Sequence, residues 1–274
     1  YVSGWDDPRM PTICGLRRRG YTPASIRNFS VRNGVSKVNS TVEYSFLEHC
    51  LREDLNLTAK RVMGVLNPVK LILTNYPEDR TETFEVENNP NRPEDGTRTV
   101  TFGRELYIEA EDFMETPVKG YFRLFPGNEV RLKTTYVVKM YRLQKRTKNG
   151  NVIEVYAEYD PESRGGNPAD GRKIKSTIHW VDAKNAEDAE IRLYDNLFTV
   201  EDPDAGDFLE LLNPDSLKVL TGCKVEAGLK TAKPGESFQF MRQGYFCVDN
   251  KDSAEDHLVF NRSVSLKDGF KKKK

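Results

Sequence analysis

The feature that most restricts the fold is a series of short segments, after Asn67 and Pro68, in which apolar and polar residues alternate. Alternation has the period of a β-strand with one buried face. Asn149 and Gly150 separate two of these segments, and this dipeptide is the strongest short-range signal of a β-hairpin. The predicted strands are residues 69–76, 104–110, 129–145, 151–159, 176–181, 190–197, 237–240 and 245–248. So many short antiparallel strands imply a barrel or a sandwich, with one short helix expected at 207–212.

The first 63 residues carry helix signals instead. Thr22 suits an N-cap, Pro23 suits the first helical position, and Gly34 suits the end of that helix. A second helix is expected to open on a capping box at residues 40–43. The sequence therefore predicts an α+β protein with its helices at the N-terminal end.

The charge balance argues against a globally basic nucleic-acid-binding protein. The chain has 42 Lys and Arg against 42 Asp and Glu, for a formal net charge of +0. Cations are nonetheless clustered, at 17–19, 145–148 and 271–274. A neutral protein with local basic patches can bind one RNA at one site without binding every polyanion. The simpler interpretation of each cluster is a solvated surface.

The sequence carries no pattern typical of an independent catalytic or metal site. It lacks a glycine-rich phosphate loop, an H-E-x-x-H motif and a nucleophile elbow. Its 4 cysteines are far apart, which argues against zinc and fits reduced thiols in the cytoplasm. No apolar run approaches the ~18 residues that cross a bilayer. We therefore expect no catalytic residue, no metal and no membrane contact.

A string near the N-terminus, GWDDPRMPTICGLRRRGYTPASIRNF (4–29), resembles the stretch after the second ATP-site motif of glutaminyl- and glutamyl-tRNA synthetases. Further collinear stretches resemble bacterial-type glutaminyl-tRNA synthetases. They are LREDLN (51–56), NPVKL (67–71), DGRKIKSTIHWV (170–181), EIRLYDNLF (190–198), SFQFMRQGYFCVD (237–249) and FNRSVSLKD (260–268). The HIGH-like and KMSKS-like motifs of that family's ligase chemistry are absent from the sequence. We expect the C-terminal, tRNA-binding half of such an enzyme, without its catalytic Rossmann domain.

The resemblance implies a specific division of the chain. Residues 1–63 would form a helical subdomain that contacts the tRNA stem. Two antiparallel β-barrels, similar to those of a ribosomal 5S-RNA-binding protein, would follow. The proximal barrel would take residues 64–118 and 199–274, and the distal barrel, inserted into it, residues 119–198.

The resemblance also assigns residues to the anticodon, whose bases this family unstacks and holds in separate pockets. Arg61, Gln239 and Arg242 match the pocket of the middle base, a uridine. The Gln239 amide can donate and accept, as a uracil edge requires. Arg123 matches the arginine that holds the third base, a guanine, and arginine commonly pairs with guanine O6 and N7.

Other positions are matched beside these pockets. Arg131 and Lys133 match positions near the first base, although the bacterial pattern more often has arginine where Lys133 stands. Asn56 and Asn91 match positions that contact bases stacked next to the anticodon. The weaker candidates, for phosphates of the tRNA backbone, are Arg17, Arg18 and Arg19. Cations that stabilise a helix terminus are the equally simple alternative for these three arginines.

The sequence thus predicts anticodon recognition for a glutamine–tRNA ligase. In the whole enzyme ATP and Mg²⁺ would be used to join glutamine to tRNA, whereas this half would hold no cofactor and be inactive alone. The expected partner is tRNA of the glutamine isoacceptors, without DNA, and the chain is expected to be a monomer. Two alternatives stay open: a stand-alone RNA-binding barrel module, or the equivalent half of a glutamyl-tRNA synthetase.

Overall fold

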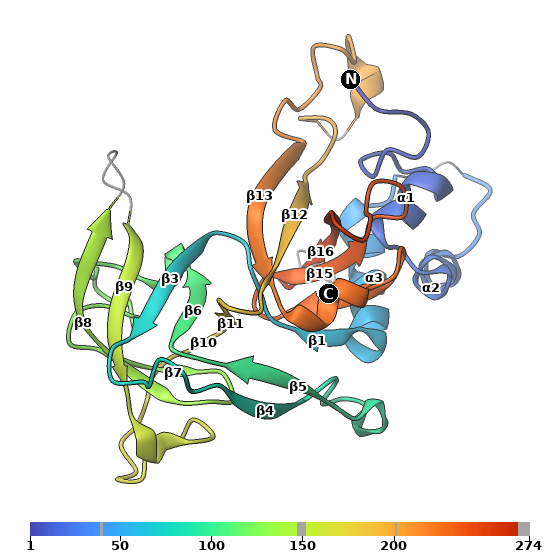
Figure 1. The fold of residues 1–274 in the computed structure, drawn as a ribbon. Coiled ribbons are helices and arrows are strands. Elements are labelled where there is room, and N and C mark those ends of the chain that lie inside the picture. The colour runs from blue at the N-terminus through green and yellow to red at the C-terminus, as the bar shows by residue number, and fades with distance from the viewer. Residues whose placement is uncertain (39–40, 147–151, 201, 268–274) are drawn as a thin grey trace.

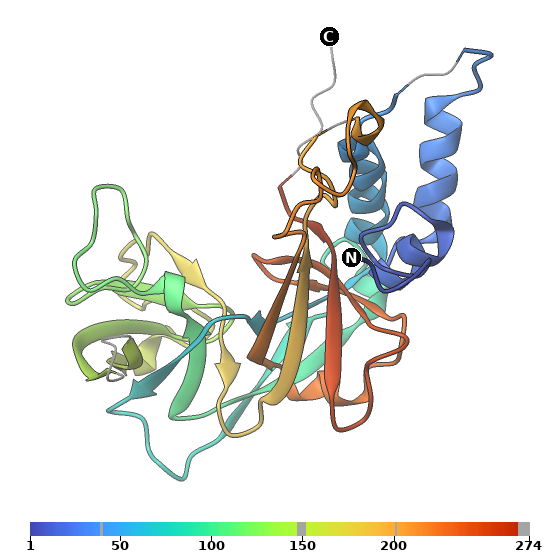
Figure 2. The ribbon, with the colours of Figure 1, turned by 90° about the horizontal axis from the view of Figure 1, so that it is seen from above.

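The computed structural model describes residues 1–38, 41–146, 152–200 and 202–267 (Figure 1). Helices at the N-terminal end pack beside one curled β-sheet, and a second curled sheet extends to the other side (Figures 1 and 2). No described helix is both long and apolar enough to span a bilayer.

The N-terminal helices begin where capping residues meet their first turns. They are α1 (Ile13–Arg19), α2 (Pro23–Asn33) and α3 (Tyr44–Thr58). The hydroxyls of Thr12 and Thr22 accept hydrogen bonds from backbone amides of α1 and α2, as N-caps do. The capping box expected at 40–43 does not open α3, which has Glu43 as its N-cap without a side-chain hydrogen bond. Ser40 itself lies outside the described residues.

The first sheet joins strands from both ends of the chain. Its order is β1 (Lys60–Val62), β14 (Ser237–Phe240), β15 (Gly244–Val248), β16 (Leu258–Ser265), β12 (Glu187–Tyr194), β13 (Leu217–Val225) and β2 (Gly64–Val65). The pairs β1–β14 and β12–β16 are parallel, and the other neighbours are antiparallel. Its core is aromatic: the rings of Phe240 and Phe246 stack with centroids 4.5 Å apart, and Phe260 meets Phe240 edge-on.

The second sheet is built from the middle of the chain. Its order is β10 (Thr177–Ile178), β7 (Glu129–Leu132), β8 (Val137–Arg146), β9 (Val152–Tyr159), β3 (Pro68–Leu73), β6 (Glu105–Glu109) and β11 (Val181–Asp182). A two-stranded ribbon, β4 (Glu82–Glu87) and β5 (Thr97–Phe102), packs against its core through Phe84 and Phe102. β8 and β9 are antiparallel, as the hairpin signal predicted, while the turn at Asn149 and Gly150 lies outside the described residues.

Short 3₁₀ turns connect several of these strands. They are η1 (Pro93–Asp95), η2 (Ala110–Asp112), η3 (Pro161–Ser163), η4 (Pro203–Ala205) and η5 (Ala227–Thr231). Residues 207–212, expected as a helix, instead form turns that end at a bridge between Leu212 and Phe198.

Strand pairing differs from the division expected from the sequence. Residues 64–118 were expected in one barrel with 199–274, but β3 and β6 belong to the second sheet, where β3 pairs with β9. β12, expected in the distal barrel, lies in the first sheet between β16 and β13. The second sheet's described strands therefore span 68–182, between β2 and β12 in sequence. This pairing has a physical cause, because β3 and β6 bury Leu71, Leu106 and their neighbours in one core with β9.

Candidate nucleic-acid interface

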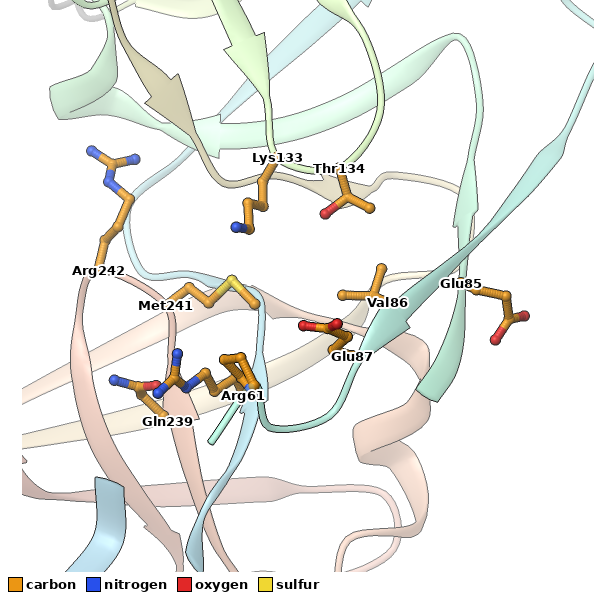
Figure 3. A pocket seen from close by; sticks show the side chains of 10 residues that line it. Arg61, Glu85, Val86, Glu87, Lys133, Thr134, Gln239, Met241 and Arg242 are labelled. Carbon is orange, nitrogen blue, oxygen red and sulfur yellow. The ribbon is translucent and has the colours of Figure 1, made fainter. Parts of the chain in front are cut away.

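A cavity of about 460 Å³ opens where the first sheet, the β4–β5 ribbon and the turn after β7 meet (Figure 3). It is lined by both polar and apolar side chains, from segments far apart in sequence. The lining residues are Arg61, Glu85, Val86, Glu87, Pro90, Lys133, Thr134, Gln239, Met241 and Arg242. The fold thus brings together Arg61, Lys133, Gln239 and Arg242, four of the residues that the sequence singled out.

Arg61 and Gln239 are side by side because β1 and β14 pair in parallel with these two residues in register. Phe238 and Phe240 flank Gln239 on the buried face of β14, so alternation turns the amide toward the cavity. Arg61 donates from Nη2 to Asn56 Oδ1 over 3.3 Å, while its buried Nε has no hydrogen-bond partner among the described residues. An unmet buried donor costs about 1–3 kcal/mol, which is a local cost that the fold bears at this position.

Asn56 and Asn91 extend the same polar surface beyond the cavity. Asn91 Nδ2 donates to the backbone oxygen of Asn56 over 3.1 Å, and both residues are exposed. Gln239 Nε2 lies 3.4 Å from the Tyr245 hydroxyl, which lies 3.5 Å from Asn56 Oδ1. Burial raises the pKa of Tyr245, which keeps this hydroxyl neutral. Tyr245 was not predicted as a site residue. All residues of β15 are buried, so no alternation of buried and exposed positions distinguishes the residue with the polar end.

Arg242 lies on the turn after β14 and is held from the second sheet. Its Nη1 and Nη2 donate to the two oxygens of Asp112, each over 2.6 Å. Nη1 also lies 3.2 Å from Nδ1 of the buried His179. Figure 3 shows the guanidinium turned away from Arg61 and Gln239. Arg242 therefore borders the cavity with its end already paired, which the sequence had not suggested.

A second cavity, of about 610 Å³, lies on the other side of Arg242. Arg123 and Arg242 both line it, together with Asp112 and Glu109. The Arg123 side chain is 43% exposed, and its Nη1 lies 3.0 Å from Asp112 Oδ1. The predicted third-base arginine thus shares a carboxylate with the predicted middle-base arginine.

Arg131 is removed from both cavities, in contrast to Lys133. Its guanidinium donates to the Gly166 backbone oxygen, and to Thr177 Oγ1 and Asn167 Oδ1 over 3.3 Å each. These hydrogen bonds attach the 160–171 loop to β7, so the Arg131 guanidinium is already bonded within the protein. Lys133 is exposed, and its side chain reaches toward Met241 across the cavity (Figure 3).

The three consecutive arginines of α1 separate by exposure. Arg18 is 6% exposed and donates from Nε to Asp249 Oδ2 over 2.9 Å. Arg19 is 5% exposed, with its guanidinium carbon 5.4 Å from the Tyr194 ring centre. Arg17 alone of the three is exposed. Arg18 and Arg19 therefore attach α1 to the first sheet, and only Arg17 is placed to meet a phosphate.

The remaining sequence features are the other two cation clusters, the cysteines and possible metal ligands. Lys148 of the 145–148 cluster and the whole cluster at 271–274 lie outside the described residues. The 4 cysteines are free, and Cys14 is exposed. Within the described residues no group of three or more His, Cys, Asp or Glu is placed to hold a metal ion.

Comparison with known proteins gives this arrangement a family. Two models described as "tRNA synthetases class I (E and Q), anti-codon binding domain" match residues 59–160 and 177–249. The catalytic-domain model of the same family matches residues 1–57, which the sequence had suggested as a stem-contact subdomain. The chain belongs to the class I tRNA synthetases of the E and Q type and contains their anticodon-binding domains.

Its curated relatives are glutamine–tRNA ligases. Over 274 residues the chain is 56% identical to that of Clostridium perfringens and 55% identical to that of Clostridium kluyveri. It is 54% identical over 272 residues to that of Vibrio cholerae. Each match covers 99% of this chain and 49% of the relative. The chain thus spans about half the length of the curated relatives that it matches.

Proposed function

We propose that this chain reads the anticodon of glutamine tRNA, as the anticodon-binding part of a glutamine–tRNA ligase. The observation that carries the proposal is the pairing of Arg61 and Gln239, in register on β1 and β14, at the first cavity. Four residues chosen from sequence alone converge on this cavity. This convergence brings together segments as far apart in sequence as Arg61 and Arg242, which are 181 positions apart.

The chemistry of the first cavity suits a base edge better than a phosphate. Gln239 and Arg61 supply donors, and the Gln239 amide adds an acceptor, as a uracil edge requires. Glu85 and Glu87 stand on the same cavity, so its charge is mixed and a dianionic group gains little there. Sequence-specific recognition of RNA works on unstacked bases whose edges are free. We therefore place the middle base of the anticodon in this cavity.

We assign the other bases around it. Arg123 contacts the edge of the third base, a guanine, and Lys133 lies near the first base. Asn56 and Asn91 support bases next to the anticodon. Arg131 acts through the 160–171 loop that it fastens, and Arg17 meets a backbone phosphate.

The longer protein is proposed to join glutamine to its tRNA. There ATP and Mg²⁺ would supply activation of the amino acid's carboxyl group. The HIGH-like and KMSKS-like motifs are absent from this sequence, so we expect it to give no ATP–pyrophosphate exchange on its own. We further infer two barrels like those of a ribosomal 5S-RNA-binding protein, the distal one inserted into the proximal one, in a cytoplasmic monomer.

The test is a titration at fixed salt of the 274-residue chain with glutamine tRNA and with a copy changed only at the middle anticodon base. Fixed salt matters because phosphate contacts make RNA affinity depend on it. We expect the changed tRNA to bind about tenfold or more weakly, since a lost pair of base contacts costs ~1–3 kcal/mol. Equal dissociation constants for the two tRNAs would remove base recognition from these residues.

A further inference from the structure

We propose that Asp112 is a positioning residue, which together with His179 fixes Arg242 and couples it to Arg123. The inference deepens the proposed function and rests on it. Asp112 is 0% exposed and lies in η2, at the end of β6 in the second sheet. Although Asp112 lines the second cavity, its side chain has no exposed surface and is paired with Arg242 and Arg123, so we expect it to act on RNA recognition through these two arginines.

The hydrogen bonds on Arg242 leave one defined edge of its guanidinium free. An arginine has five N–H donors in a rigid plane. Asp112 takes one donor from each of Nη1 and Nη2, and His179 Nδ1 takes the second donor of Nη1. The two that remain are the Nε–H and the outer Nη2–H, which lie side by side. This edge can bind a planar acceptor in two places, as guanidinium forks do.

His179 lies between Arg242 and Glu109 and contacts both through its ring nitrogens. Nδ1 lies 3.2 Å from Arg242 Nη1, a group that only donates, so Nδ1 is placed to accept. Nε2 lies 3.2 Å from Glu109 Oε1 and is placed to donate to it. The positive charges of Arg123 and Arg242 balance the negative charges of Asp112 and Glu109, which favours a neutral base over a phosphate.

The backbone at Arg242 shows that its position is imposed. Arg242 has φ +68°, a left-handed conformation that costs a non-glycine residue about 1 kcal/mol or more. On one side Met241 donates its amide to the Val62 oxygen over 2.9 Å. On the other, Gln243 Nε2 donates to Glu109 Oε1 over 2.5 Å. The turn is thus fastened to both sheets, and the Asp112 pair sets the direction of the side chain that it carries.

The carboxylate of Asp112 couples the two cavities, because it pairs with an arginine of each. Arg242 lines both cavities, and Arg123 lines the second. Because both guanidiniums contact Asp112 Oδ1, removing the charge of Asp112 releases both at once. A change at Asp112 should therefore weaken discrimination at the middle and third anticodon bases together. Loss of a single base-contacting arginine would affect mainly its own base.

The test compares Asp112→Asn with Asp249→Asn in the 274-residue chain. Asp249 is also 0% exposed and is also paired with an arginine, Arg18, but it lines neither cavity. The probes are RNA stem-loops with a CUG anticodon, and copies changed at the middle or the third base. For Asp112→Asn we expect the preference for CUG to fall roughly tenfold at both bases. For Asp249→Asn the preference should stay at the wild-type value, whatever happens to stability.

A double-mutant cycle separates positioning from general destabilisation. If Asp112 acts through Arg242 and Arg123, Asp112→Asn should change binding less than about twofold when both arginines are already alanine. An undiminished effect in that background would overturn the proposal, as would unchanged preference in Asp112→Asn alone. Should Asp112→Asn fail to fold, His179→Gln and His179→Leu are compared instead. Glutamine can still accept from Arg242 and donate to Glu109, so it should retain the preference for the middle base that leucine loses, and equal behaviour of the two would contradict the proposal.

Failure of the proposed function looks different. In that case the wild-type chain itself would bind all three stem-loops equally, and the positioning role of Asp112 would fall with it. A wild-type preference for CUG that survives in Asp112→Asn would retain the proposed function and reject only the role of Asp112.

Discussion

At the scale of single residues, the site depends on two side chains that β-sheet register sets next to each other. Arg61 and Gln239 are partners on β1 and β14, and both face the first cavity. The sequence could single out both residues, but the contact between them arises only from the parallel pairing of strands 177 positions apart. The local sequence of neither strand specifies this pairing.

Gln239→Glu tests the role of this pair. The change keeps the shape of the side chain and replaces an amide that donates and accepts by a carboxylate that only accepts. A carboxylate beside Arg61 would also form an ion pair with the guanidinium of that residue. We expect the preference for uridine at the middle anticodon position to fall by about 1–3 kcal/mol. Binding of stem-loops with each middle base would measure this, and an unchanged difference in affinity between uridine and the other bases would exclude Gln239 from the contact.

At the scale of elements, sequence reasoning located segments whose signals are local. The hairpin predicted around Asn149 and Gly150 is confirmed by the antiparallel pairing of β8 and β9. β16 was not predicted, because it is buried on both faces and shows no alternation. α1 was not delimited either, since seven residues make only two turns. Burial from two sides and short length both erase the periodicity on which such predictions depend.

The attachment of α1 to the first sheet gives a prediction for pH. Burial alone would raise the pKa of Asp249, but hydrogen bonds from Arg18 and Asn261 hold it below the ordinary value. A carboxyl with a lowered folded pKa stabilises the fold at pH values above its unfolded pKa, ~3.9, and loses this contribution as pH falls. The free energy of unfolding of the wild type should therefore fall more steeply below about pH 4 than that of Asp249→Asn.

Denaturant unfolding at a series of pH values measures this difference. At neutral pH the Asp249→Asn variant should be the less stable of the two, since Arg18 keeps a buried charge without its main partner. Parallel curves for the two proteins through the acid range would show that Asp249 is not held ionised by the fold.

At the scale of the whole molecule, a polar cluster joins the two sheets at the point where the chain crosses between them. Glu109 of β6 accepts hydrogen bonds from the amides of Leu66 and Asn67, on the link from β2 to β3, each over 2.9 Å. Arg242 of the first sheet is bound by Asp112 of the second. Neither carboxylate was predicted from sequence. From sequence alone, an acidic residue at the end of a strand is expected to be solvated. Its burial becomes clear only when the fold shows that four distant segments meet around it.

Arg242→Ala should reveal this structural role alongside the effect on RNA. As a candidate base contact, Arg242 should weaken RNA binding when it is replaced. The structure adds that the fully buried Asp112 would be left with Arg123 as its remaining cation. We expect the free energy of unfolding to fall by about 1–3 kcal/mol. Unfolding of Arg242→Ala beside Arg123→Ala, whose side chain is more exposed, measures it, and wild-type stability in Arg242→Ala would contradict this expectation.

The second sheet is connected to the first by two covalent crossings, from β2 to β3 and from β11 to β12. The two sheets also share packed side chains, because Met63 and Val65, beside the first crossing, are buried in the core of the second sheet. Arg242 and Asp112 pair across the same junction, so their hydrogen bonds help to fix the spacing between the walls of the two cavities.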